Sequence, residues 1–80
     1  MTQIINGQLV SRVKLHNSHN GNPRYRLRIY TVAETISLVT KTDGQVGYYA
    51  TNFKIGEWCI FEVSGIKRQT IVAITKDITL

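Results

Sequence analysis

Hydrophobic and polar residues alternate along most of this chain, which is the pattern of β-strands that bury one face. The clearest case is the segment 24–30, which reads Arg-Tyr-Arg-Leu-Arg-Ile-Tyr. Side chains on a strand point alternately to its two faces, so Arg24, Arg26 and Arg28 are expected together on one face. The segment therefore predicts a strand with one apolar face and one basic face.

Four more segments have strand-like patterns. A first strand is predicted over 3–16, with a bend or bulge at Gly7, because strands of this length usually curl. Its inward residues are expected to be Ile5, Leu9, Val13 and Leu15. Further strands are predicted over 35–42, 57–64 and 69–76. The last of these has apolar residues at both parities, which is typical of a strand buried on both faces in a closed barrel.

Composition supports an all-β domain with little helix. Val, Ile and Thr make up 26 of the 80 residues, whereas Ala and Leu make up eight. β-Branched side chains favour strands over helices. No long amphipathic helix fits the chain, and a single helical turn is expected from Thr51 through Asn52 to Lys54. One domain over residues 1–80 is expected.

The hairpin between the first two strands is expected to gather more cations. The run from Asn17 to Pro23 is rich in turn-forming residues, so the two strands should pair directly. If the apolar faces coincide, two registers are possible. In one, residue 14 pairs with 26 and residue 12 with 28. In the other, residue 14 pairs with 24 and residue 12 with 26. Either register places Arg12 and Lys14 beside the arginine row.

The small size and the single cysteine bear on stability and location. A chain of 80 residues buries only about 60–65% of its unfolded surface. Cys59 is the single cysteine, so the chain can form neither an intramolecular disulfide nor a cysteine cluster for zinc. We therefore expect the chain to be stabilised by self-association into a homodimer. No signal sequence and no apolar stretch approaching the ~20 residues of a membrane span is found. We expect a cytoplasmic protein.

Charge points to a polyanionic partner, and no set of residues points to catalysis. The formal net charge is +5, which favours binding to polyanions. His16 and His19 flank a turn without metal-ligand neighbours, and the five acidic residues are scattered. No nucleophile, base and orienting group come together, so we expect no enzyme, metal or cofactor.

The strand pattern resembles that of the OB-fold. Five strands, a long first strand bent at a glycine and a longer connection before the fourth strand match its plan. The segment 53–65, in which Lys54-Ile55-Gly56 leads into alternating apolar residues and ends at Gly65, resembles the fourth strand of OB-fold single-strand-binding proteins. The fold class expected is all-β, a small five-stranded OB-type barrel with little or no helix. An SH3-like small barrel remains the alternative, because the helix of the OB family is reduced here to a loop.

A second resemblance is to the helix-destabilising single-stranded-DNA-binding proteins of filamentous phages. Gly21-Asn22-Pro23-Arg24-Tyr25 is similar to their "G-x-P-Y" hairpin, with one extra residue before the tyrosine. The chain is also similar in length and in its tyrosine-bearing excursion before the fourth strand. The resemblance implies a homodimer that coats single-stranded DNA during phage or bacterial replication, in the host cytoplasm if the protein is phage-encoded.

Non-specific single-strand binding requires cations for phosphates and aromatic rings for bases. The candidate residues are the cations Arg12, Lys14, Arg24, Arg26, Arg28, Lys67 and Arg68 and the rings Tyr30, Tyr48 and Tyr49. Trp58 is expected on the surface or in a dimer contact. Two other readings stay open: a single-stranded RNA-binding OB domain, and a protein-interaction barrel that uses Trp58, Ile60 and the strand at 69–76.

Overall fold

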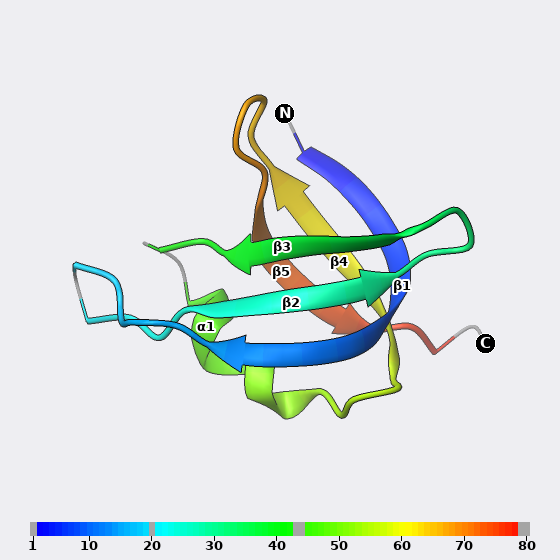
Figure 1. Ribbon diagram of the computed structural model, residues 1–80, viewed down its shortest axis with the longest axis horizontal. Coiled ribbons are helices and arrows are strands. Elements are labelled where there is room, and N and C mark those ends of the chain that lie inside the picture. The colour runs from blue at the N-terminus through cyan, green and yellow to red at the C-terminus, as the bar shows by residue number, and fades with distance from the viewer. Residues whose placement is uncertain (1, 20, 43–44, 79–80) are drawn as a thin grey trace.

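The chain folds into one closed barrel of five strands in a computed structural model that describes residues 2–19, 21–42 and 45–78 (Figure 1). The strands are β1 (Thr2–Lys14), β2 (Tyr25–Tyr30), β3 (Thr35–Thr40), β4 (Trp58–Ser64) and β5 (Thr70–Lys76). They follow one another around the barrel in the order β1-β2-β3-β5-β4. The predicted all-β class is confirmed, and each predicted strand lies within two residues of the observed one at both ends.

Long β1 closes the barrel because its two halves pair with different strands. Its first half pairs with β4 and its second half pairs with β2, both antiparallel. The predicted bend at Gly7 falls between these halves. A Cβ at Gly7 would meet Ile29 Cγ2 and would lie 2.8 Å from the carbonyl oxygen of Tyr30. Glycine is therefore needed where β1 passes closest to β2.

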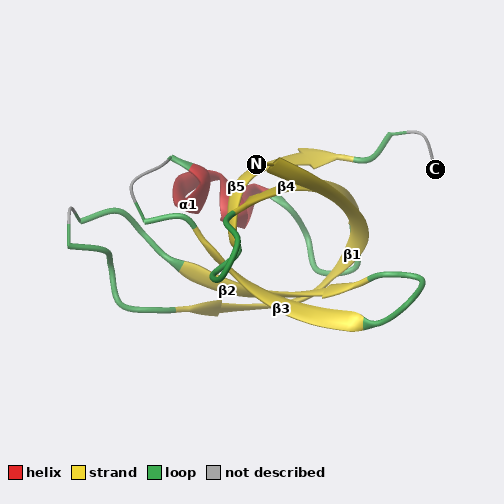
Figure 2. Cartoon of the chain, turned by 90° about the horizontal axis from the view of Figure 1, so that it is seen from above, coloured by secondary structure: helices red, strands yellow, loops and turns green. Residues whose placement is uncertain are grey.

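The pairing of β3 with β5 is the shortest in the barrel. These strands run parallel and pair only at Val39 with Thr70 and at Thr40 with Ile71. Beyond these pairs the two strands diverge, as the two views of the chain show (Figures 1 and 2). The edge of β3 before Val39 therefore faces the β4–β5 turn instead of a strand.

The core is built from inward side chains of β1, β2, β4, β5 and the helical segment, and the partly buried Ile36 and Leu38 of β3 pack against it. It comprises Leu9, Leu27, Ile29, Val46, Cys59, Phe61, Val63 and Ile71. The predicted inward residues of β4 are confirmed. Burial raises the pKa of the Cys59 thiol to about 11, so this thiol is protonated and packs as a small hydrophobic group. In β5, Ile71 is buried while Val72, Ala73 and Ile74 are half-buried.

The predicted helical turn at 51–54 is wrong in position. Helical residues lie earlier, in α1 (Val46–Tyr49) and the 3₁₀ turn η1 (Ala50–Asn52). Neither has a side-chain cap, so packing determines the position of the turn. Val46, Gly47 and Ala50 are buried against the barrel, and a Cβ at Gly47 would meet the carbonyl oxygen of Pro23.

Candidate nucleic-acid interface

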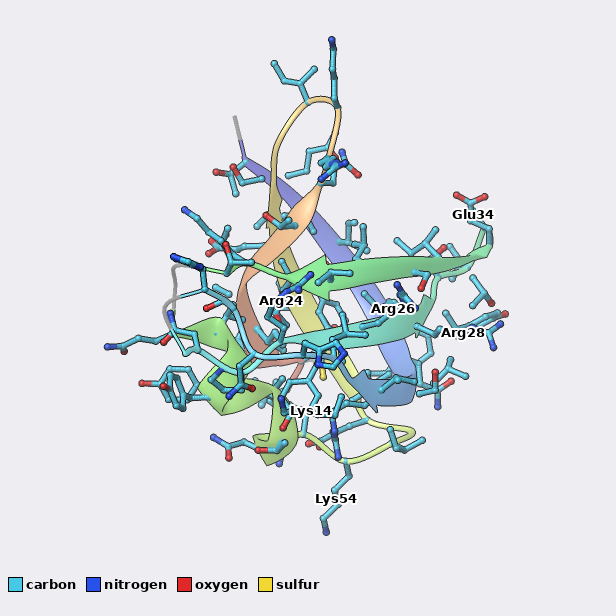
Figure 3. The ribbon with its side chains drawn as sticks, turned by 60° about the vertical axis from the view of Figure 1, so that its left-hand side comes forward. Lys14, Arg24, Arg26, Arg28, Glu34 and Lys54 are labelled. Atoms are coloured by element: carbon cyan, nitrogen blue, oxygen red, sulfur yellow. The ribbon has the colours of Figure 1, made fainter. Side chains whose placement is uncertain are left out.

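The arginine row lies on the outer face of β2. Arg26 and Arg28 are exposed and alternate with the fully buried Leu27 and Ile29, as predicted. Arg24 directly precedes the strand (Figure 3). Within the part of the chain that the structure describes, Arg26 and Arg28 form no hydrogen bond or ion pair. Their charges are balanced by no carboxylate of the described residues.

The predicted hairpin register is wrong because β1 contains a bulge. The β1–β2 register shifts between Leu9 and Ser11, which leaves Val10 as the extra residue. A bulge exchanges the two faces of the strand after it. Arg12 therefore pairs with buried Leu27, and Val13, predicted inward, pairs with Arg26 and is 51% exposed. The bulge thus removes Arg12 from the arginine row.

Arg12 has a structural position. Its Nη1 donates hydrogen bonds to the carbonyl oxygens of Phe53 (2.7 Å) and Ala50 (3.2 Å). These bonds join the inner side of β1 to the end of η1. Arg12 was a candidate phosphate contact from the sequence, and the geometry assigns it instead to holding the helical segment against the barrel.

Arg12→Met is expected to lower the free energy of unfolding by about 1–3 kcal/mol, because two part-buried carbonyl oxygens lose their donor. Methionine keeps most of the side-chain length without the guanidinium. Urea unfolding measures the effect, and affinity for an oligonucleotide should change by less than about threefold. A large loss of affinity with unchanged stability would return Arg12 to the interface.

Lys14 also leaves the outer face of the hairpin but still reaches the basic region. It pairs with Tyr25, and its Nζ lies 5.7 Å from the centre of that ring. The same Nζ donates to Leu15 O (2.9 Å) and Asn17 Oδ1 (2.6 Å). A hollow of about 520 Å³ is lined by Lys14, Leu15, His16, Arg24 and Arg26. Lys14 therefore lies beside the arginine row at the base of the β1–β2 loop.

A second hollow, of about 430 Å³, lies where β3 faces the β4–β5 turn. Its lining comprises Arg24, Ser37, Leu38, Val39, Thr40, Thr42, Arg68, Gln69 and Thr70. Arg24 thus lines both hollows, and Arg68 faces it across the second. Lys67 is exposed in the same turn but does not line the hollow. Of the two cations predicted in this turn, the structure brings Arg68 to the arginine row.

An aromatic pair stands at the far end of the row. Tyr30 is 44% exposed on the outer face of β2, and its ring lies edge-to-face with Trp58, with the ring centres 6.4 Å apart. The two residues are neighbours because Gln8 of β1 pairs with both. Trp58 thus joins the candidate stacking residues. Its outward parity in β4 was visible in the sequence, but its closeness to Tyr30 depends on the barrel.

The two tyrosines of α1 are exposed, as predicted, at the other end of β2. The Tyr48 hydroxyl donates to Asn22 Oδ1 (3.3 Å) in the β1–β2 loop, two residues before Arg24. The Tyr49 hydroxyl donates to Gln45 Oε1 (3.4 Å). Tyr48 therefore borders the basic region, whereas no contact links Tyr49 to it.

Among the described residues, no three His, Cys, Asp or Glu side chains are grouped so as to hold a metal ion. No helix in the described ranges has the length and apolar character needed to cross a membrane. No protein-family model, curated protein or solved structure matches the chain. The resemblances to OB-fold and phage proteins rest on the sequence motifs and stay predictions.

Proposed function

We propose that this protein binds single-stranded nucleic acid, DNA in the first place, without strong sequence preference. The observation that carries the proposal is the row of arginines on β2, whose two exposed members have no partner among the described residues and which ends at the Tyr30–Trp58 pair. The proposed contact residues are Lys14, Arg24, Arg26, Arg28, Tyr30, Tyr48, Trp58 and Arg68. Tyr49 and Lys67, which are also candidates from the sequence, are not among the proposed contacts.

The chemistry of a single strand suits this arrangement. Outward side chains on one strand are about 7 Å apart, so three guanidinium groups repel one another unless an anion neutralises them. Phosphates supply that charge, and counterion release favours binding. Bases that are free of a duplex stack on exposed rings, each contributing about 1–3 kcal/mol with little regard to sequence. Exposed rings at the end of a basic row therefore favour a single strand over a duplex.

The rest of the proposal follows the phage resemblance. It includes DNA in preference to RNA, a role in phage or bacterial replication, the cytoplasm as the compartment, and binding without catalysis. A homodimer is proposed on the same ground and on the small size of the chain, and sedimentation equilibrium at micromolar concentration tests it.

A second candidate function is a protein-interaction barrel. On the outer face of β1 and β4, Ile4 is 58% exposed and Ile60 is half-buried. The pairing of these strands places the two residues on the same outer face. A partner bound there would be held by apolar contact, which salt does not weaken.

Tyr30→Ala is expected to weaken binding of oligo(dT) by about 5- to 100-fold, because one base loses its stacking surface. Tyr30→Phe keeps the ring and should bind within about threefold of the native protein. Tyr49→Ala is the control for an exposed tyrosine outside the row, and the same titration measures all three. Equal affinities for the two alanine variants would contradict the role of Tyr30.

A further inference from the structure

Arg24 contains a buried polar atom without a partner. Its Nε is inaccessible to solvent and forms no hydrogen bond with any described residue, although the side chain as a whole is only half-buried. Buried donors in native proteins are nearly always paired, with protein, water or a bound ion. A cationic donor left unpaired is more costly than a neutral one. The hydrogen bonds of the Arg24 guanidinium are therefore incomplete in the free protein.

The surroundings of Arg24 indicate the kind of ligand. The second hollow has a guanidinium at either side, from Arg24 before β2 and from Arg68 in the β4–β5 turn. The hydroxyl residues Ser37, Thr40, Thr42 and Thr70 and the amide residue Gln69 also line it, and no carboxylate of the described residues does. Donors of this kind without a negative group suit an anion.

Thr40 orders the backbone beside Arg24. The residue is fully buried, and its Oγ1 accepts a hydrogen bond of 3.1 Å from the backbone N–H of Tyr25. This bond holds the first residue of β2, next to Arg24, in place behind the hollow.

We propose that this hollow is a phosphate-binding subsite, in which Arg24 and Arg68 hold one phosphate group from opposite sides. Arg24 binds through the paired terminal donors of its guanidinium and fixes the position of that phosphate. Arg26 and Arg28, which are exposed and do not line this hollow, contact the following phosphates through charge alone. That this phosphate belongs to a nucleic-acid strand rests on the proposed function. The existence of a phosphate-binding site in the hollow does not depend on that function.

Replacing an arginine by lysine distinguishes a bidentate hydrogen-bonded contact from a purely electrostatic one. Lysine keeps the positive charge but lacks the planar pair of donors, so the exchange is not conservative where the contact is bidentate. Arg24→Lys is expected to weaken oligo(dT) binding by about tenfold or more. Arg28→Lys, the matched control on the same row, should weaken it by less than about threefold.

Inorganic pyrophosphate probes the subsite without nucleic acid. In a titration at constant ionic strength, followed by ¹⁵N NMR, we expect saturable shifts of the Arg24 Nε–H signal and of the Gln69 and Thr70 backbone amides. The Arg26 and Arg28 side-chain signals should change little. Arg24→Lys should lose the saturable response, and Arg68→Lys, which alters the opposite side of the hollow, should weaken it. Equal, non-saturating shifts at all arginines would overturn the subsite.

The two experiments also distinguish the subsite from the proposed function. If pyrophosphate saturates the Arg24 site while oligo(dT) does not bind, the subsite stands and the nucleic-acid function fails. If oligo(dT) binds and Arg24→Lys and Arg28→Lys weaken it equally, the function stands and the subsite is refuted. The circular dichroism spectrum of each variant confirms that its barrel is folded.

Discussion

Arg26→Glu is expected to reduce the affinity for oligo(dT) by about 30- to 100-fold at low salt. Arg26 is at the centre of the row, exposed on β2 between Val13 and Val39, so its charge is directed at the proposed path of the strand. The substitution removes one attraction and adds one repulsion, each on the order of 1–1.5 kcal/mol near a protein surface. Because the side chain has no partner among the described residues, stability should change by less than about 0.5 kcal/mol.

Lys54→Glu is the matched control for this experiment. It changes the formal net charge by the same amount, and Figure 3 shows Lys54 pointing away from the arginine row. Its affinity should stay within about threefold of the native protein, because this charge is directed away from the proposed path of the strand. Equal losses in both variants would mean that net charge, and not the row, governs binding.

Gly47→Ala is expected to lower the free energy of unfolding by about 1–3 kcal/mol, although alanine is the better helix former. The added methyl group would meet the carbonyl oxygen of Pro23, which is backbone and cannot rotate away. The segment α1 would have to move off the β1–β2 loop, which weakens the packing of Val46 and Ala50. The loss is a large share of the roughly 5–15 kcal/mol that stabilises a small domain.

Urea unfolding, followed by circular dichroism, measures this change. Thr51→Ala, at an exposed position of the next helical turn, is the control and should shift stability by no more than about 0.5 kcal/mol. If Gly47→Ala were as stable as the native protein, the close contact between α1 and Pro23 would be wrong.

The sequence predicted the strands well because each has a strong local pattern. Cys59, Phe61 and Val63 alternate with outward residues in β4, and all three are buried as expected. The arginines of β2 alternate with Leu27 and Ile29 in the same way, so the basic face was predicted correctly. In both strands a period of two residues suffices to assign the faces.

The second half of β1 could not be assigned in this way. Val10, the bulged residue, and Val13 are both apolar and both at least 40% exposed, so hydrophobicity gives no sign of the shift. The inner position is held instead by Arg12, whose guanidinium finds carbonyl acceptors in η1 and Phe53. The register depends on pairing with β2 and on contacts distant in sequence, which a local pattern does not contain.

The position of the stacking rings was hidden for the same reason. Tyr30 and Trp58 are 28 residues apart and come together only because β1 pairs with both strands that carry them. The phosphate subsite likewise combines Arg24 with Arg68 across the short β3–β5 pairing. The sequence predicts most of these side chains as contact residues, but their grouping depends on how the strands pair in the barrel.

The most direct test of the proposed function is a titration with oligo(dT) at several salt concentrations, followed by the fluorescence of Trp58, the single tryptophan of the chain. If the five proposed cations neutralise phosphates, the logarithm of the affinity should fall with the logarithm of salt with a slope of about −3.5, which is about elevenfold per doubling. Binding of a single strand with this dependence is the predicted result. Absence of binding at about 50 mM salt, or binding that salt does not weaken, would contradict nucleic-acid recognition by the arginine row.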